Sequence, residues 1–361
     1  MNRSEMSPVT TLTLRHAWHG DADVAALRLC REQLLEMRIS LSDAIPGDMC
    51  DLIKMHGMDI LDARRSQPAS LKDLRSVAVE SQWADRLPGL IRTHMQTGES
   101  WHGIPLGIHQ SNRMWVNPAW ANKLGGAMPS CWPAFLIWLE QAKRYLAAPL
   151  AVGAETWQIS VIFEAVVLAT GGKKLYEQAF VEMLPSVWSD PAMHQALAYL
   201  MALREYVDDQ VFARDWAFQA SRVARGEATV QFMGDWARVA NPDLLEWSAP
   251  GTAKWSVAVV DYFVPLAHVP LSVAELAALS LTEPAFQARL AIRKGCIPVL
   301  HTASTWLGRK LPAQQHLLPS VAFEQCCATA VRQSMLETVG RHFVDRLSAA
   351  TCAQALAKAV R

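Results

Sequence analysis

The stretch GIPLGIHQSNRMWVNPAW, from Gly103 to Trp120, decides how the rest of this chain is interpreted. Its first half alternates apolar side chains at Ile104, Leu106 and Ile108, which is the period of a β-strand. Polar residues follow, beginning with His109, and such a strand is typical of a crossover between two lobes. Because ligands of open α/β sheets bind at the carboxyl ends of strands, His109 is a candidate binding residue. A purely structural hydrogen-bonding role in the turn is the alternative.

Length and composition indicate a globular protein of two domains or lobes. At 361 residues the chain is too long for one compact core. Its 34 basic and 34 acidic residues give a formal net charge of +0, which argues against a nucleic-acid partner, because such surfaces need a basic excess. No stretch has the unbroken apolar run of a membrane span, so we expect no direct insertion into a membrane.

Export is left open by the first residues and by the cysteines. The opening MNRSEMSPVT lacks the apolar centre of a secretory signal, so either the chain stays in the cytosol or a leader is missing from this start site. The number of cysteines is odd and no CxxC pair occurs, which predicts small buried residues rather than a disulfide framework. Cysteines of this kind favour a reducing compartment. The seven are Cys30, Cys50, Cys131, Cys296, Cys326, Cys327 and Cys352.

The chain begins with the strand–helix–strand order of a parallel sheet. Residues 11–16 alternate as a strand, and Asp21 or Asp23 is placed to cap the amphipathic helix that follows. Residues 48–55 form another short apolar run that ends at His56. Short loops between these elements predict βαβ units and an α/β fold.

Later segments continue this mixture of helices and strands. The apolar run at 158–170 predicts a helix that ends at Gly171-Gly172, because paired glycines are a helix stop signal. Residues 255–264 predict a strand that carries one charged residue, Asp261, inside an apolar run.

The order of several motifs resembles the family 1 extracellular solute-binding proteins, which are the sugar receptors of ABC importers, and especially their glucose/mannose-type branch. The resemblance covers most of the chain, and the motifs fall on the predicted strand ends. The motifs that carry it are LTLRHAWHGDAD, IPGDMCDLIKMHG, WHGIPLGIHQSNRMWVN, GGAMPSCWPAF, ETWQISVIFEAVVLATGG, GEATVQFMGDWA, VVDYFVPL, RKGCIPV and PSVAFEQ.

This resemblance implies a two-lobed α/β fold of the periplasmic-binding-protein type II, with a hinge and an interlobe ligand cleft. Strands that cross at Asn112 and near Trp255 would form the hinge, where few residues absorb the motion. The expected lobes are 1–112 with 255–300, and 113–254 with 301–361.

The resemblance and the residue chemistry together imply a set of sugar-binding residues. Trp18 and Trp236 suit the apolar face of a pyranose, with core packing as the alternative for each. Asp261 is costly to bury unless it is paired, and Lys294 suits either its neutralisation or the same sugar hydroxyls. Asp59 has the alternative of a solvated helix residue. The full set is Trp18, His56, Asp59, His109, Trp236, Asp261 and Lys294.

Two positions depart from the family pattern. Ala17 stands where the family has the first of two adjacent tryptophans, so one stacking surface is missing. Phe323 stands where a histidine often contacts the sugar. The exchange removes a hydrogen-bond donor and adds an apolar wall, which favours a less polar or modified sugar.

The resulting prediction is a solute-binding receptor that captures a glucose/mannose-like monosaccharide or small saccharide and delivers it to a membrane permease. We expect a periplasmic monomer without cofactor, metal ligand or catalytic residue. A cytosolic sugar-sensing protein of the same fold is one alternative. A glycoside-processing enzyme is another, although no second carboxylate is obviously paired with Asp261. A metal receptor built on His16, His19, His56 and His109 is disfavoured by their spacing.

Overall fold

The computed structural model describes residues 9–153, 155–209, 214–308 and 311–360, in two compact units. The first eight residues, on which the prediction about a leader rests, lie outside this description. Unit 1 comprises Met1–Ile108 and Val260–Gln314, and unit 2 comprises His109–Val259 and Gln315–Arg361. The chain passes between the units within two strands, β6 and β11, and once more after Gln314. The predicted lobes differ from these units at residues 109–112, 255–259 and 301–314. The units are defined by compactness, so the division into two lobes that move about a hinge stays a prediction.

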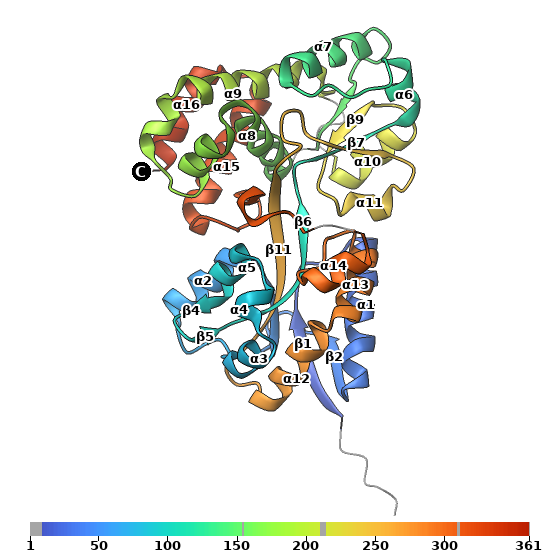
Figure 1. Cartoon of the computed structure of the whole chain (residues 1–361). Helices are drawn as coiled ribbons and strands as arrows, with labels where there is room; N and C mark the ends of the chain where they lie inside the picture. The colour runs from blue at the N-terminus through green and yellow to red at the C-terminus, as the bar shows by residue number, and fades with distance from the viewer. Residues whose placement is uncertain (1–8, 154, 210–213, 309–310, 361) are drawn as a thin grey trace, which may run out of the picture. The chain divides into compact units, whose positions relative to one another are not determined.

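Unit 1 is built on a mixed sheet whose strand order is β2-β1-β3-β11, with β6 also paired to β11 (Figure 1). Figure 1 shows α1 and α13 on one side of β1, and α2 and α5 on the other. Its elements are β1 (Thr10–Arg15), α1 (Asp21–Glu36), β2 (Ile39–Asp43), β3 (Leu52–Met55), α2 (Gly57–Ser66), α3 (Arg75–Glu80), α4 (Trp83–Arg86), α5 (Gly89–Met95), β4 (Gln96–Thr97), β5 (Ser100–Trp101), β6 (Ile104–Gln110), β11 (Ser256–Pro265), α12 (Leu271–Leu281), α13 (Pro284–Lys294) and α14 (His301–Trp306).

The direction of the strands brings several loops of unit 1 to one edge of the sheet. Strand β1 pairs in parallel with both β2 and β3, so the carboxyl ends of the three strands lie together. The loop that carries Trp18 follows β1, and His56 follows β3 directly. Strand β11 runs antiparallel to β3 and supplies Asp261 from the opposite direction.

Unit 2 combines a small sheet, ordered β10-β7-β9-β8, with a helical layer in which α8 packs on α9 and α15. Most apolar residues of α8, including Phe163, lie in a core that also contains Phe135 and Phe343. Its further elements are β7 (Arg113–Val116), α6 (Pro118–Lys123), α7 (Trp132–Lys143), β8 (Leu150–Ala151), α8 (Thr156–Phe180), η1 (Pro185–Ser189), α9 (Pro191–Ala202), η2 (Leu203–Tyr206), α10 (Trp216–Ala224), β9 (Val230–Phe232), α11 (Ala237–Ala240), β10 (Leu245–Ser248), η3 (Gln314–His316), β12 (Leu317–Pro319), α15 (Thr329–Val344) and α16 (Ala349–Ala359).

The predicted end of the helix at Gly171-Gly172 is confirmed as a break in the helical backbone. The span α8 consists of two helical segments on either side of Gly172, whose φ of 66° and ψ of −167° are not helical, and the second segment runs to Phe180. This second segment buries Leu175, Tyr176 and Phe180, so core packing favours a new helical segment directly after the local stop signal. Among the described residues, no helix has the length and apolarity that crossing a membrane would need.

The Gly172 kink predicts a specific cost of substitution. Its φ and ψ lie in a region that only glycine adopts easily, and a Cβ added there would meet no atom within 4 Å. We therefore expect Gly172→Ala and Gly172→Asn each to lower the free energy of unfolding by about 1–3 kcal/mol through backbone strain alone. Urea unfolding measures this cost.

Asparagine rescues glycine only in the left-handed helical region, so an Asn variant as stable as wild type would contradict this conformation of Gly172. The matched control is Gly20→Ala, because Gly20 has φ −72° and an added Cβ would make only an ordinary contact, 3.6 Å from Asp23 Oδ2. We expect that control to cost less than about 1 kcal/mol.

Candidate functional site

In unit 1, ionisable side chains meet on one face of the sheet because of the register between β3 and β11. Phe263 stands opposite Lys54, Asp261 lies two residues from Phe263 on β11, and His56 lies two residues from Lys54, directly after β3. Residues that face each other across an antiparallel pair, or lie two apart on one strand, share a face of the sheet. The register alone therefore puts Lys54, His56 and Asp261 on one face.

Asp261 is the centre of this group. Its Oδ1 lies 2.9 Å from Lys54 Nζ and 3.4 Å from His56 Nε2, and its Oδ2 lies 3.8 Å from Lys294 Nζ. Lys54 Nζ also lies 2.6 Å from His56 Nε2. Burial opposes ionisation of Asp261, but Lys54, His56 and Lys294 together hold the pKa of its carboxyl well below the usual range. Asp261 is therefore an ionised acceptor surrounded by donors.

Lys294 connects Asp261 to the predicted aromatic platform. It lies at the end of α13, forms an ion pair with Asp23 in the first turn of α1, and places Nζ 3.8 Å from the centre of the Trp18 ring. The other neighbour of Trp18 is Phe263, with ring centroids 5.6 Å apart. Only 7 % of Trp18 is exposed, so most of its ring is used in packing and in this cation–π contact.

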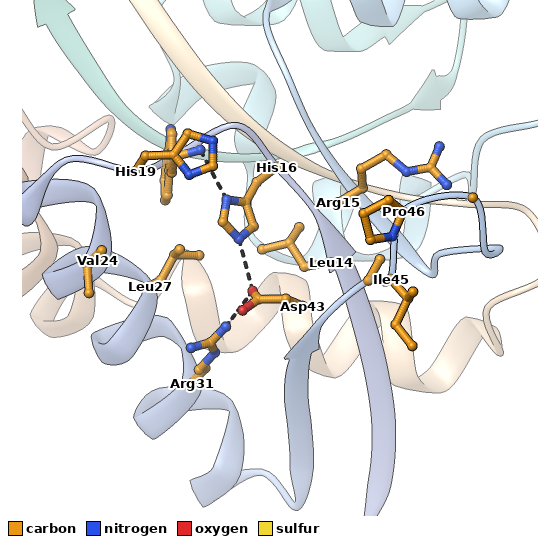
Figure 2. Close-up of a pocket in the computed structure, with 13 residues that line it drawn as sticks. Leu14, Arg15, His16, His19, Val24, Leu27, Arg31, Asp43, Ile45 and Pro46 are labelled. Carbon is orange, nitrogen blue, oxygen red and sulfur yellow. Dashed lines mark hydrogen bonds and ion pairs between the residues drawn. The ribbon is translucent and has the colours of Figure 1, made fainter.

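The loop that carries Trp18 is held by His16 (Figure 2). His16 Nδ1 accepts the Trp18 N–H at 3.1 Å, while Nε2 lies 2.9 Å from Asp43 Oδ1. These contacts fit an imidazole protonated on Nε2 that donates to Asp43, which also pairs with Arg31 at 2.5 Å. A pocket of about 720 Å³ opens here at the carboxyl ends of β1 and β2, with Trp18 in its lining. The two contacts of His16 therefore orient the loop that carries Trp18.

Asp59 has a structural task in this structure. Its Oδ2 accepts the backbone N–H of His56 at 2.8 Å, in the first turn of α2. This bond satisfies a donor at the start of the helix and fixes His56, which faces Asp261. A direct contact between Asp59 and sugar stays a prediction.

In unit 2, His109 is tied to a second buried acid. His109 Nδ1 lies 2.6 Å from Asp235 Oδ1, and Oδ2 of the same carboxylate accepts the Gln110 N–H at 3.1 Å. Both side chains are almost completely buried. The bond fixes the orientation of the imidazole, and it joins β6 to the turn after β9.

Three partly exposed aromatic rings form a series of contacts that begins beside His109, and we call Trp157, Trp236 and Phe323 the aromatic cluster. The Trp236 ring is 5.5 Å from that of His109 and 5.2 Å from that of Phe323, both edge-on. The Phe323 and Trp157 rings are 5.5 Å apart. A Cβ at position 234 would collide with the Trp236 ring, which explains the glycine found there.

The structure thus brings together the predicted residues within each unit. Those of unit 1 are Trp18, His56, Asp59, Asp261 and Lys294, and those of unit 2 are His109 and Trp236. Sequence reasoning missed Lys54, Asp23, Asp235 and Trp157. Lys54 could have been found, because it is a lone charged residue inside the apolar run LIKM, and the same kind of pattern identified Asp261. Among the described residues, no three His, Cys, Asp or Glu side chains are placed to hold a metal ion.

Comparisons with known proteins bear on this arrangement. A protein of Brucella suis biovar 1 (strain 1330), named "Probable sugar-binding periplasmic protein", is 29 % identical over 96 % of this chain and 90 % of its own length. The solved structure of the solute receptor AcbH, whose title gives an exclusive preference for b-D-galactopyranose, has a TM-score of 0.79 at 14 % identity, over 97 % of this chain and 98 % of its own. A "Chitin oligosaccharide binding protein" has a TM-score of 0.79 at 16 % identity and the same coverage. No family model matches the chain.

These likenesses confirm the predicted fold class, the two-lobed α/β fold of periplasmic solute-binding proteins. The compared proteins are named as binding proteins or receptors, which confirms the expected class of binding protein rather than enzyme.

The surroundings of Asp261 predict a stability that depends on pH. Lys54→Met removes a charged partner at 2.9 Å, so we expect the free energy of unfolding at neutral pH to fall by about 1.5–3 kcal/mol. Because the folded-state pKa of Asp261 is lowered, its contribution is present above the unfolded value of about 3.9 and is lost as pH falls towards the folded value. The difference between wild type and variant should therefore shrink in acid, as urea unfolding between about pH 3 and pH 7 can measure.

The matched control is Lys173→Met, because Lys173 forms an exposed pair with Glu177, 3.4 Å away on α8. Such surface pairs contribute less than about 1 kcal/mol, so this variant should show little change at any pH. A loss in Lys54→Met that is the same at every pH would argue against the pairing with Asp261.

Proposed function

We propose that this chain is the sugar-binding receptor of an ABC importer. The observation that carries the proposal is the ionised Asp261 held among Lys54, His56 and Lys294, with Trp18 beside it. Asp261 can accept a bond from one hydroxyl while the flanking nitrogens donate to neighbouring ones. Charge-assisted bonds of this kind contribute roughly 1.5–3 kcal/mol each, enough to discriminate epimers. The name of the Brucella suis relative supports a sugar as the ligand.

The two units carry different chemistry. Unit 1 offers charged donors and acceptors for hydroxyls, whereas Trp236 of unit 2 offers an aromatic surface for the C–H face of a sugar ring. We propose that the lobes close on the sugar and that the closed receptor delivers it to the membrane permease. Binding and release, without chemical conversion, complete this cycle.

For the ligand we propose a glucose/mannose-like monosaccharide or small saccharide, on the strength of the motifs around Trp18, His56, Asp261 and Lys294. Phe323 favours ligands with a less polar edge, because it contributes no hydrogen-bond donor. We propose a periplasmic monomer, which the relative's name supports for location. A cytosolic sugar sensor of the same fold is the second candidate, favoured by the seven cysteines, none of which forms a disulfide among the described residues.

A melting-shift screen tests this function. We expect at least one member of a panel of D-glucose, D-mannose, D-galactose, maltose and raffinose to raise the melting temperature, because ligand at 100 times Kd adds about 2.7 kcal/mol. Asp261→Ala should abolish the shift, since it removes the central acceptor. Trp236→Ala should reduce the shift without unfolding the protein, since its ring is partly exposed.

The control is Trp306→Ala, because Trp306 is 60 % exposed and lies in α14, outside both residue sets. This variant should keep the full shift. Equal shifts in wild type, Asp261→Ala and Trp236→Ala would remove the proposed site, and a panel without any shift would remove the proposed ligand class.

A further inference from the structure

Glu164, in α8, is an acid without exposed surface that has no part in the site described above. Its Oε1 accepts bonds from the Tyr176 hydroxyl at 3.1 Å, from the Ala322 N–H at 3.2 Å and from the Val321 N–H. Ser320 Oγ lies 3.0 Å from both carboxyl oxygens. A buried carboxyl costs free energy unless it is hydrogen-bonded in this way. The role of Glu164 is therefore sought in the residues to which it is bonded.

What Glu164 holds is the backbone that leads into the aromatic cluster. Residues 320–322 are bonded to it one after another, and the next residue is Phe323. The Phe323 ring touches both Trp236 and Trp157 and lines a pocket of about 310 Å³ together with Trp157. Since Trp157 lies in the first turn of α8, one helix carries both a ring of the cluster and the acid that anchors the segment opposite.

We infer that Glu164 is a positioning residue, which sets the place of Phe323 against Trp157 and Trp236 and thereby the shape of the aromatic wall in unit 2. It acts through the loop and does not touch ligand. The part of this inference that concerns sugar affinity rests on the proposed function, whereas the placement of the rings does not.

The protonation of Glu164 provides a test of the inference, because a pH dependence of the aromatic cluster is not expected if Glu164 only stabilises the fold. Burial raises its pKa to about 7, against the hydrogen bonds from Ser320, Val321, Ala322 and Tyr176. The other ionisable groups that face it are the Tyr176 hydroxyl and the thiols Cys326 and Cys327, and Arg332 of α15 acts on those thiols. Because the folded pKa is raised, the stabilising contribution is complete below the ordinary value of 4.5 and is lost as pH rises through about 7.

Fluorine NMR of the full chain labelled with 5-fluorotryptophan tests the placement. The signals of Trp157 and Trp236 are assigned from the variants Trp157→Phe and Trp236→Phe. We expect Glu164→Ala to shift both signals, because the loop loses its anchor. Glu164→Gln should keep them near their wild-type positions, since its amide oxygen still accepts the N–H groups and its NH₂ can donate to Ser320 Oγ.

In wild type, both signals should titrate near the pKa of Glu164, about 7, and Glu164→Gln should abolish that titration. The control is Ser160→Ala on the same helix, because Ser160 is fully buried and its hydroxyl donates to Thr156 O within the helix. Unshifted signals in Glu164→Ala, or a titration that survives in Glu164→Gln, would overturn the inference. Should Glu164→Ala not fold, the titration in Glu164→Gln decides alone.

Calorimetric titration with D-glucose, D-mannose, D-galactose, maltose and raffinose tests the effect on affinity. For any sugar that binds wild type, Glu164→Ala should weaken binding about twofold to tenfold, the range expected for misplacing one aromatic contact. In the Phe323→Ala background the same substitution should have a much smaller effect on affinity, because the ring through which Glu164 is proposed to act is absent.

The outcomes separate the two proposals. Unchanged affinity in Glu164→Ala, or an equal loss with and without Phe323, would overturn the role of Glu164 in binding. If none of the sugars binds wild type, the proposed function fails, and the fluorine signals alone decide whether Glu164 positions the cluster.

Discussion

A carboxylate buried in an apolar strand must be neutralised by the surrounding fold, and Asp261 imposes this requirement on three other elements of unit 1. Lys54 comes from β3, His56 from the start of α2 and Lys294 from the end of α13. Each partner is far from Asp261 in the chain, so the charge is balanced only when the sheet has its native register. The same contacts that satisfy the acid leave a compact set of donors and acceptors, so the fold and the candidate site depend on one electrostatic constraint.

The constraint extends beyond the four groups through Lys294. Its ammonium is shared between Asp261, Asp23 and the face of Trp18, and Trp18 in turn packs on Phe263, two residues from Asp261. A rigid aromatic ring is thereby tied to the charged group. Such preorganisation reduces the entropy that a ligand would have to pay on binding.

In unit 2 the candidate binding residues are aromatic rings rather than a group of charged side chains. Its aromatic cluster is positioned by edge-on ring contacts and by two buried acids, Asp235 at His109 and Glu164 under the loop before Phe323. Phe323 donates no hydrogen bond from its side chain, but its ring takes part in two aromatic contacts. It forms an aromatic wall with Trp157 and Trp236, so the side chains of this cluster offer apolar surface rather than charge.

Local patterns were sufficient for the strands β1 and β11, for the α/β order and for Asp261, because alternation and a lone buried charge are visible within a few residues. They also located the break in α8 at Gly172, but not the second helical segment that follows it, which is favoured by the burial of Leu175 and Phe180. They also gave no sign that Asp59 caps α2, since that depends on where the helix begins.

By itself the sequence determined the fold class and most of the residues proposed to bind sugar, because periodicity and motif order are properties of the chain alone. Only the tertiary structure decided the partners: that Lys54 faces Asp261, that Asp23 shares Lys294, and that Glu164 anchors the segment before Phe323. These contacts join residues far apart in the chain, and they are set by strand register and helix packing, which no local pattern records.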